Sequence, residues 1–341
     1  IEGRDAQLRD EAVYVTAYFD AMSPVPAVAP GAEQASSAAA LLELARVWSE
    51  RQPQRTVVLI WTAGHFQNLA GMRYLTPVVM AAAGRRSPDR LSRQERALAE
   101  RLSDFRLRFA AGLDLSTGSS LMGVFRPTAP FRSSLLAPPI TGQLMDTAAV
   151  FEDSLHSGRP VLANGLKQDF SRQGLGAMAE VVPMDASVLA LAGCPTVAFA
   201  TINDSRSRFD VVDDVPERVQ ELQLGEQLEL LEFLLPSLVD DPELASWNWG
   251  NDAFGTISGQ VVHYGPRSYL PDEPTGNALV RVRLRNPTLA GVRPDFWAAA
   301  DDSGYYAIPG VETRIIYTQP VRLEAYGVDE RGAIIDAPDW G

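Results

Sequence analysis

Continuous apolar runs alternate with amphipathic stretches over the first two thirds of the chain. Val13–Tyr18 is a short run rich in residues that favour strands. Thr56–Trp61 is a continuous apolar run bounded by polar residues, which is typical of a strand buried on both faces of a sheet. Between them, Leu41, Leu44 and Trp48 follow helical spacing. The alternation continues, with helices predicted over Gln67–Leu75, Ser92–Leu102, Asp146–Leu155 and Pro216–Leu235, and strands over Phe105–Leu115 and Pro195–Ala200. The segment Asp185–Leu191 leads through Gly193 into the last of these strands. Strands that alternate with helices predict an α/β fold with a mostly parallel sheet.

The pattern changes after Pro236. Helical spacing disappears from Gly255 onward, and period-two alternation takes its place, as in Ala278–Leu284 and Val321–Tyr326, with the turn signal Asp302-Ser303-Gly304 between them. This pattern predicts a small C-terminal all-β sandwich of antiparallel strands. We therefore expect an α/β domain over residues 1–238, a linker over 239–254 and the sandwich over 255–341.

Composition narrows the range of partners and sites. The formal net charge of −13 repels a phosphate backbone, so nucleic acid is not an expected partner. The single cysteine, Cys194, excludes an intrachain disulfide and a thiolate zinc cluster. The longest apolar run, Val188–Ile202, contains Gly193 and Pro195 and is shorter than the roughly 20 residues of a membrane-spanning helix. We expect no membrane-spanning segment in this chain.

Five stretches resemble, in order, the motifs of the di-zinc aminopeptidase family, which includes glutamate carboxypeptidase, glutaminyl cyclase, the transferrin receptor ectodomain and nicastrin. The stretches are Ala17-Tyr18-Phe19-Asp20, Gly31–Ser37, Thr62–Leu75, Gly112-Leu113-Asp114 and Phe209–Val215. The resemblance implies a three-layer α/β/α domain whose N-terminal part precedes Ile1. It also implies a peptidase-like pocket at the carboxyl ends of the parallel strands.

The family's catalytic chemistry uses two zinc ions, held by imidazole and carboxylate ligands around a bridging carboxylate, with a glutamate as general base. By resemblance, Tyr18 stands at the first imidazole ligand and Glu33 at the bridging aspartate. His65 stands at the general base, Phe66 at the glutamate ligand beside it, and Asp210 at the last histidine ligand. The aspartate ligand is retained as Asp114, and Asp20 retains the position that orients the first imidazole. A frame that is kept while most donors are lost is typical of a pseudoenzyme.

Three functions are compatible with these residues. The first is a catalytically degenerate aminopeptidase-fold domain that binds a protein or peptide, or acts as a scaffold, in a larger protein, with no cofactor. The second is a metallopeptidase or amidohydrolase with a rebuilt single-metal site, in which Glu33, Asp114 and Asp210 hold one divalent ion and His65 is the base. The third is a carbohydrate- or surface-binding module led by Trp247 and Trp249. We favour the first function, and therefore no enzymatic activity.

The remaining acidic side chains of the former pocket need a counter-charge. Without zinc, Glu33, Asp114 and Asp210 would repel one another unless a cation or an arginine lies among them. Arg73, Arg206 and Arg208 are the candidates, and we favour the segment Ser205–Arg208 because it immediately precedes Asp210.

The C-terminal domain resembles the transthyretin-like sandwich of carboxypeptidase regulatory regions. The matching segments are Ile257–Val261, Thr275–Val282 and Ala300–Ile308. The resemblance implies a spacer or docking role, and an extracytoplasmic location for the whole protein.

Overall fold

The computed structural model describes residues 1–23, 25, 27, 30–125, 137–155, 160–164, 184–209, 211–242, 244, 248–250, 252–265, 270–284, 295–313, 320–329 and 333–336. Among the predicted site residues, Asp210 and Trp247 lie outside these ranges. The chain divides into two compact units, the first over Ile1–Asp252 with Leu289–Gly291 and the second over Ala253–Thr288 with Val292–Gly341. No helix within the described ranges is both long and apolar enough to cross a membrane.

The first unit is built on a six-stranded, mostly parallel sheet with the order β2-β1-β3-β6-β4-β5. The strands are β1 (Glu11–Tyr18), β2 (Thr56–Thr62), β3 (Arg106–Asp114), β4 (Met122–Phe125), β5 (Leu162–Asn164) and β6 (Thr196–Thr201). β2, β1, β3 and β6 run parallel, whereas β4 pairs antiparallel with β6. Every residue of β1 is buried, as is typical of a central strand in a parallel sheet.

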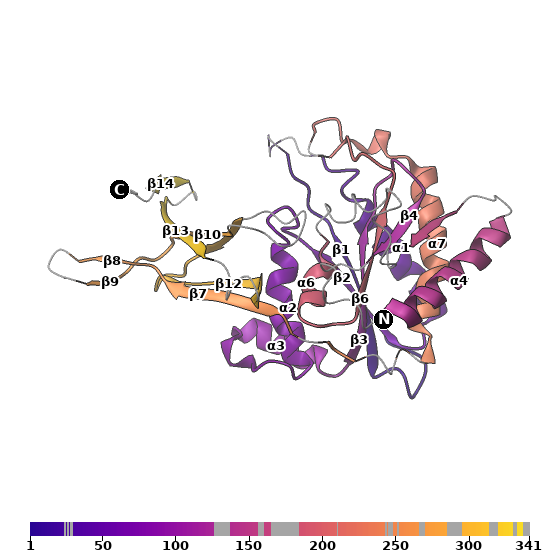
Figure 1. The fold of residues 1–341 in the computed structure, drawn as a ribbon, viewed down its shortest axis with the longest axis horizontal. Coiled ribbons are helices and arrows are strands. Elements are labelled where there is room, and N and C mark those ends of the chain that lie inside the picture. The colour runs from indigo at the N-terminus through magenta and orange to yellow at the C-terminus, as the bar shows by residue number, and fades with distance from the viewer. Residues whose placement is uncertain are drawn as a thin grey trace. The chain divides into compact units, whose positions relative to one another are not determined.

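Helices cover both faces of this sheet, which confirms the predicted α/β class (Figure 1). α1 (Ser36–Arg51), α4 (Ala137–Leu155) and α7 (Glu221–Val239) share one apolar core with the sheet. On the other side, α2 (Ala70–Ala82) packs against α3 (Arg93–Leu102) and α6 (Ala186–Leu191). Two short 3₁₀ helices, Pro88–Arg90 and Pro216–Arg218, complete the described elements of this unit.

Local backbone chemistry explains where element boundaries differ from the sequence prediction. The helix expected at Gln67 begins only at Ala70, because Asn68 and Leu69 adopt positive φ angles of 61° and 59°. The helix expected from Pro216 begins at Glu221, since the proline starts a separate 3₁₀ turn. The short strands β4 and β5 were not predicted, because runs of four and three residues carry little periodic signal.

An ion cluster closes the amino-terminal edge of the sheet. Glu11, which is 3% exposed, opens β1 and accepts a hydrogen bond from Arg55 Nε at 2.9 Å. Its other oxygen accepts from Arg106 at 2.9 Å and Arg108 at 2.7 Å, both on β3. Arg55 is fully buried and also donates to the carbonyl of Val239 at the end of α7. One carboxylate thus ties β1, β3 and the approach to β2 together.

The second unit is all-β, and each strand pair described in it is antiparallel. A four-stranded sheet has the order β11-β10-β13-β14, and two-stranded sheets are formed by β12-β7 and β8-β9. The strands are β7 (Phe254–Gln260), β8 (Val262–Tyr264), β9 (Pro271–Pro274), β10 (Leu279–Leu284), β11 (Asp295–Ala299), β12 (Tyr305–Glu312), β13 (Val321–Val328) and β14 (Ile334–Asp336). Side chains of the β10 sheet and of β12-β7 form one apolar core. The turn before β12 needs Gly304, whose φ is +77°.

Candidate functional site

Strand register gathers the predicted site residues at the carboxyl edge of the first sheet. Tyr18 ends β1 and pairs with Thr62, which ends β2. Asp114 ends β3 and pairs with Ala200 of β6. His65 and Phe66 follow β2 in the loop that leads to α2. Open α/β sheets place their ligands at this edge, so the location suits a functional site.

Three aromatic rings fill the centre of this site. Tyr18 stacks on His65 with ring centroids 3.8 Å apart and planes 21° apart. Phe66 meets both rings edge-on, with centroids 5.8 Å from Tyr18 and 5.0 Å from His65. Burial and the charge of Asp114 hold the pKa of the Tyr18 phenol well above its usual value. Tyr18 is therefore a neutral phenol, which is a poor metal ligand.

His65 is held by two aspartates. Its Nδ1 lies 3.2 Å from Asp185 Oδ2, and its backbone N–H donates to Asp20 Oδ1 at 3.3 Å. Burial alone would lower the pKa of His65, but the hydrogen bond and charge of Asp185, with the charges of Asp114 and Asp20, outweigh it and raise the pKa. His65 is placed as a charge partner of Asp185.

Asp185 is a site residue that sequence reasoning missed. It precedes α6, where an aspartate is normally interpreted as a helix cap. Its side chain makes no capping hydrogen bond and instead contacts His65, which is far away in sequence. The contact joins segments 120 residues apart, so the sequence around Asp185 carries no local signal of it.

Asp114 is paired with a guanidinium group. Arg206 Nη1 donates to Asp114 Oδ1 at 2.5 Å, and Nη2 donates to the Asp114 backbone carbonyl at 3.0 Å. Tyr18 Oη also lies 3.5 Å from Asp114 Oδ1. Asp114 is 2% exposed, so this ion pair is almost entirely removed from water.

Glu33 has a second arginine. Arg208 Nη2 lies 2.9 Å from Glu33 Oε2. Thr117 adds a hydroxyl hydrogen bond to the same oxygen at 2.8 Å and a backbone N–H bond to the other oxygen. The backbone N–H of Glu33 donates to Asp214 Oδ1 at 2.6 Å. The prediction that arginines of Ser205–Arg208 lie among the acidic side chains is confirmed for Asp114 and Glu33.

The third candidate arginine, Arg73, bonds to backbone carbonyls of the loop after β2. Arg73, on α2, donates to the carbonyls of Asn68 at 2.7 Å and Gln67 at 3.3 Å, and so braces the loop that carries His65. Burial lowers its pKa to about 10. Asp210, the third acidic residue predicted for this site, lies outside the described residues.

The described residues do not fit a two-zinc centre. Phe66 has no donor atom, the Tyr18 phenol is neutral, and guanidinium groups lie on the carboxylates of Asp114 and Glu33. Within the described ranges, no three His, Cys, Asp or Glu side chains are arranged to hold a metal ion. Two zinc ions would need four to five donors that converge.

Trp249 is engaged within its own unit. Its Nε1 donates to the Leu107 carbonyl at 3.3 Å, and the Arg85 guanidinium lies 5.4 Å from its ring centroid. These contacts use both the polar atom and one face of the ring. The surface-binding function that Trp247 and Trp249 suggested remains a hypothesis, because Trp247 is outside the described residues.

Comparison with known proteins gives a family match at the start of the chain. Residues 1–76 match the model of peptidase family M28. This match covers β1, α1, β2 and the loop with His65 and Phe66. No curated protein sequence matches the chain significantly.

Solved structures that resemble the chain include two of aminopeptidases. BSAP, a zinc aminopeptidase from Bacillus subtilis, is 15% identical with a TM-score of 0.44, over 71% of this chain and 49% of that one. An aminopeptidase from Aneurinibacillus sp. strain AM-1 is 16% identical with a TM-score of 0.41, over 69% and 45%. LapA from Legionella pneumophila is 15% identical with a TM-score of 0.42, over 68% and 54%. The chain thus spans about half the length of these structures.

The His65–Asp185 pair predicts a pH-dependent stability. A raised pKa in the folded state means that the stabilisation is complete below about pH 6.5, the unfolded value, and is lost as the pH rises through the folded value. Urea unfolding between pH 5.5 and 8.5 should show the free energy of unfolding falling in the native chain. The slope should be smaller in Asp185→Asn, and equal slopes would contradict the charge partnership.

Proposed function

We propose that the first unit is a peptidase-fold domain that has lost its metal centre and now serves in binding or as a scaffold. The observation that carries this proposal is the Arg206–Asp114 pair, with 2.5 Å between Nη1 and Oδ1. A guanidinium group at this carboxylate opposes the approach of a second cation, because like charges repel strongly in a buried site. The family match over residues 1–76 supports the ancestry of the frame.

The side chains around this pair support the same conclusion. The general-base position holds His65, whose Nδ1 is engaged by Asp185. Phe66 packs against Tyr18 and His65. Its phenyl ring stands at the position where the family has a glutamate that binds zinc, and it offers no atom that can bind a metal. A site built of stacked rings and internal ion pairs is organised for stability, with few groups left to activate water.

The arginine pairs weigh against the rebuilt single-metal hydrolase. That site would need Glu33 and Asp114 to release Arg208 and Arg206 before they could bind a divalent ion. For the second unit, we propose a spacer or docking role of the transthyretin-like kind. The two units would then belong to a larger extracytoplasmic protein with a protein or peptide partner.

Metal content tests this proposal directly. After dialysis against metal-free buffer, elemental analysis of the purified chain should find well under one equivalent of zinc. The variant Asp114→Ala is the control, because any metal held elsewhere persists in it. Two equivalents of zinc in the native chain that are lost in Asp114→Ala would overturn the proposal.

A further inference from the structure

We infer that the segment Ser205–Arg208 is an internal strap, whose two guanidinium groups take the electrostatic place of metal ions at Asp114 and Glu33. The strap would hold the carboxyl edge of the sheet together without any dissociable ion. This inference rests on the proposed loss of the metal centre, and it names what replaced the metal.

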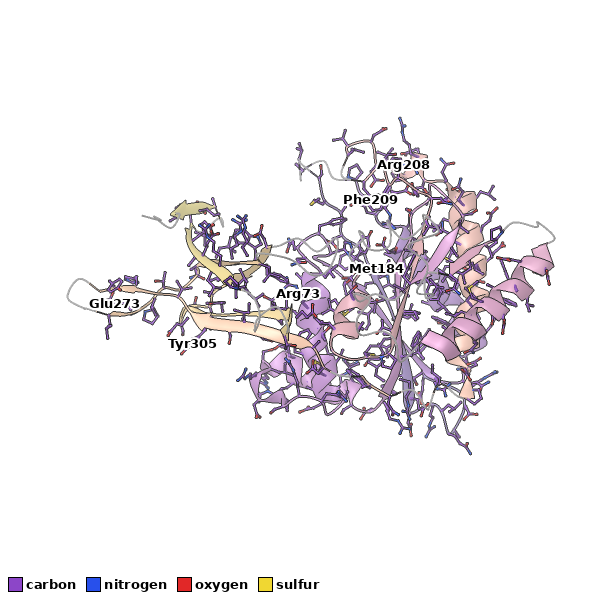
Figure 2. The ribbon with its side chains drawn as sticks, in the orientation of Figure 1. Arg73, Met184, Arg208, Phe209, Glu273 and Tyr305 are labelled. Carbon is purple, nitrogen blue, oxygen red and sulfur yellow. The ribbon has the colours of Figure 1, made fainter. Side chains whose placement is uncertain are left out.

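The first contact of the strap is fixed on several sides. Arg206 reaches both the carboxylate and the backbone carbonyl of Asp114. The side chain is 11% exposed, and its guanidinium carbon lies 5.1 Å from the Phe209 ring centroid. A guanidinium with two hydrogen bonds and an aromatic neighbour is strongly oriented. Figure 2 shows Phe209 beside Arg208 at the upper end of the first unit.

The backbone of the strap is held in an unusual conformation. Arg206 has a φ of 50°, which is uncommon for a residue with a side chain. Asp204 supports it, because Asp204 Oδ1 accepts from the Arg206 N–H at 2.9 Å while Oδ2 accepts from the Gly118 N–H at 3.0 Å. Burial alone would raise the pKa of Asp204, but these bonds and the charge of Arg206 lower it. The strained residue is therefore anchored to the loop after β3.

The second contact links three parts of the chain. Arg208 Nη2 contacts Glu33 at 2.9 Å and Thr117 Oγ1 at 3.2 Å, and Nη1 donates to the Arg218 carbonyl at 2.7 Å. Glu33 lies just before α1, and Thr117 lies after β3. In a metal enzyme, a metal ion can join separate carboxylates directly. Here each carboxylate has its own guanidinium group, and the short stretch of chain from Arg206 to Arg208 connects the two ion pairs.

Guanidinium groups differ from metal ions in one decisive respect. A metal leaves when a chelator competes for it, whereas an arginine side chain stays attached and charged throughout the ordinary pH range. Two buried carboxylates that would otherwise repel are thereby neutralised permanently. While the strap is in place, a partner cannot use Asp114 or Glu33 as a cation site.

Thermal unfolding of the full chain, with and without EDTA or added MnCl₂, tests the strap. We expect the native Tm to change with neither addition. Arg206→Met should lower the Tm by roughly 6–15 °C, as for the loss of one partner of a buried ion pair. MnCl₂ should then recover a small part of the lost Tm, because a cation near Asp114 offsets the charge of a buried carboxylate that has lost its arginine. Arg206→Lys keeps a charge and should lose less stability, and it serves where Arg206→Met does not fold.

The control is Arg218→Met, because Arg218 pairs with Asp213 where both side chains are more than half exposed. We expect it to change the Tm little and to show no response to MnCl₂. The strap inference fails if Arg206→Met has the same Tm as this control, or if MnCl₂ leaves the Tm of Arg206→Met unchanged. The proposed loss of the metal centre would stand in both cases. A native Tm that falls in EDTA, with zinc found in the chain, would instead overturn the proposed function.

Discussion

The substitution Glu11→Gln should lower the free energy of unfolding by about 3–5 kcal/mol, which is the usual cost of removing one partner from a buried ion pair. Arg55 is fully buried, and its Nε lies 2.9 Å from Glu11 Oε2. Glutamine has nearly the same volume as glutamate, so the loss would come from charge and hydrogen bonding, with little change in packing. Urea unfolding at pH 7 measures it.

Arg106→Gln is the matched control for this prediction. Arg106 contacts the same carboxylate at 2.9 Å, but its side chain is 66% exposed. We expect this variant to lose less than about 1 kcal/mol, as is common for exposed pairs. Equal losses in the two variants would contradict the view that burial gives the cluster its strength.

The dependence of the free energy of unfolding on pH, at acid pH, gives a second measurement on Glu11. Burial alone would raise the pKa of Glu11, but hydrogen bonds and charges of Arg55 and Arg108 lower it overall. A lowered pKa stabilises the fold above about pH 4.3, the unfolded value, and the benefit is lost as the pH falls through the folded value. The difference between the native chain and Glu11→Gln should therefore shrink below pH 4.

If the metal centre was lost as we propose, zinc binding should return only when the family's ligand types are placed at these positions and the arginines of the strap are removed. A variant with Arg206→Ala and Arg208→Ala in addition to the restored ligands should bind zinc with a dissociation constant on the order of 1 μM or below, or about 8 kcal/mol. The restored ligands are Tyr18→His, Glu33→Asp, His65→Glu, Phe66→Glu and Asp210→His. Calorimetry with zinc, and circular dichroism to check folding, give the measurement.

The matched comparison keeps the two arginines. With Arg206 in place, the Asp114 carboxylate already carries a guanidinium group, so the five restorations alone should leave zinc affinity close to that of the native chain. Single restorations should do as little, because ligands of one metal act as a unit. Tight zinc binding by the five-residue variant with both arginines present would show that they do not block the site.

Much of the fold was accessible from apolar periodicity. The apolar run at Thr56–Trp61 predicted β2 within one residue, and Ser92, the expected start of a charged helix, caps α3 with a capping box to Glu95. Boundaries were missed where local geometry overrides periodicity, as at Leu69, which is apolar but adopts a left-handed conformation. The Leu69 N–H donates to the His65 carbonyl at 3.0 Å, and apolar periodicity does not record a tight loop of this kind.

The site was predictable to a different extent. Charge balance together with the nearness of Ser205–Arg208 to Asp210 predicted an arginine among the acidic side chains, and Arg206 and Arg208 confirm it at Asp114 and Glu33. The contact of His65 with Asp185 was not predicted, because it depends on how α6 approaches the loop after β2. Contacts between segments 120 residues apart follow from tertiary packing, which a single sequence does not specify.

The order of strands in the first sheet also has a consequence for folding. β1 pairs with β2 and β3, and β3 pairs with β6, so the centre of the sheet joins residues near positions 11, 106 and 196. The Arg206–Asp114 pair spans a further separation of 92 residues. Such non-local pairings fold slowly and leave apolar strands exposed in the meantime. On the ribosome, the free side of β3 would wait for β6 to emerge, and chaperone dependence of the nascent chain would be greatest in that interval.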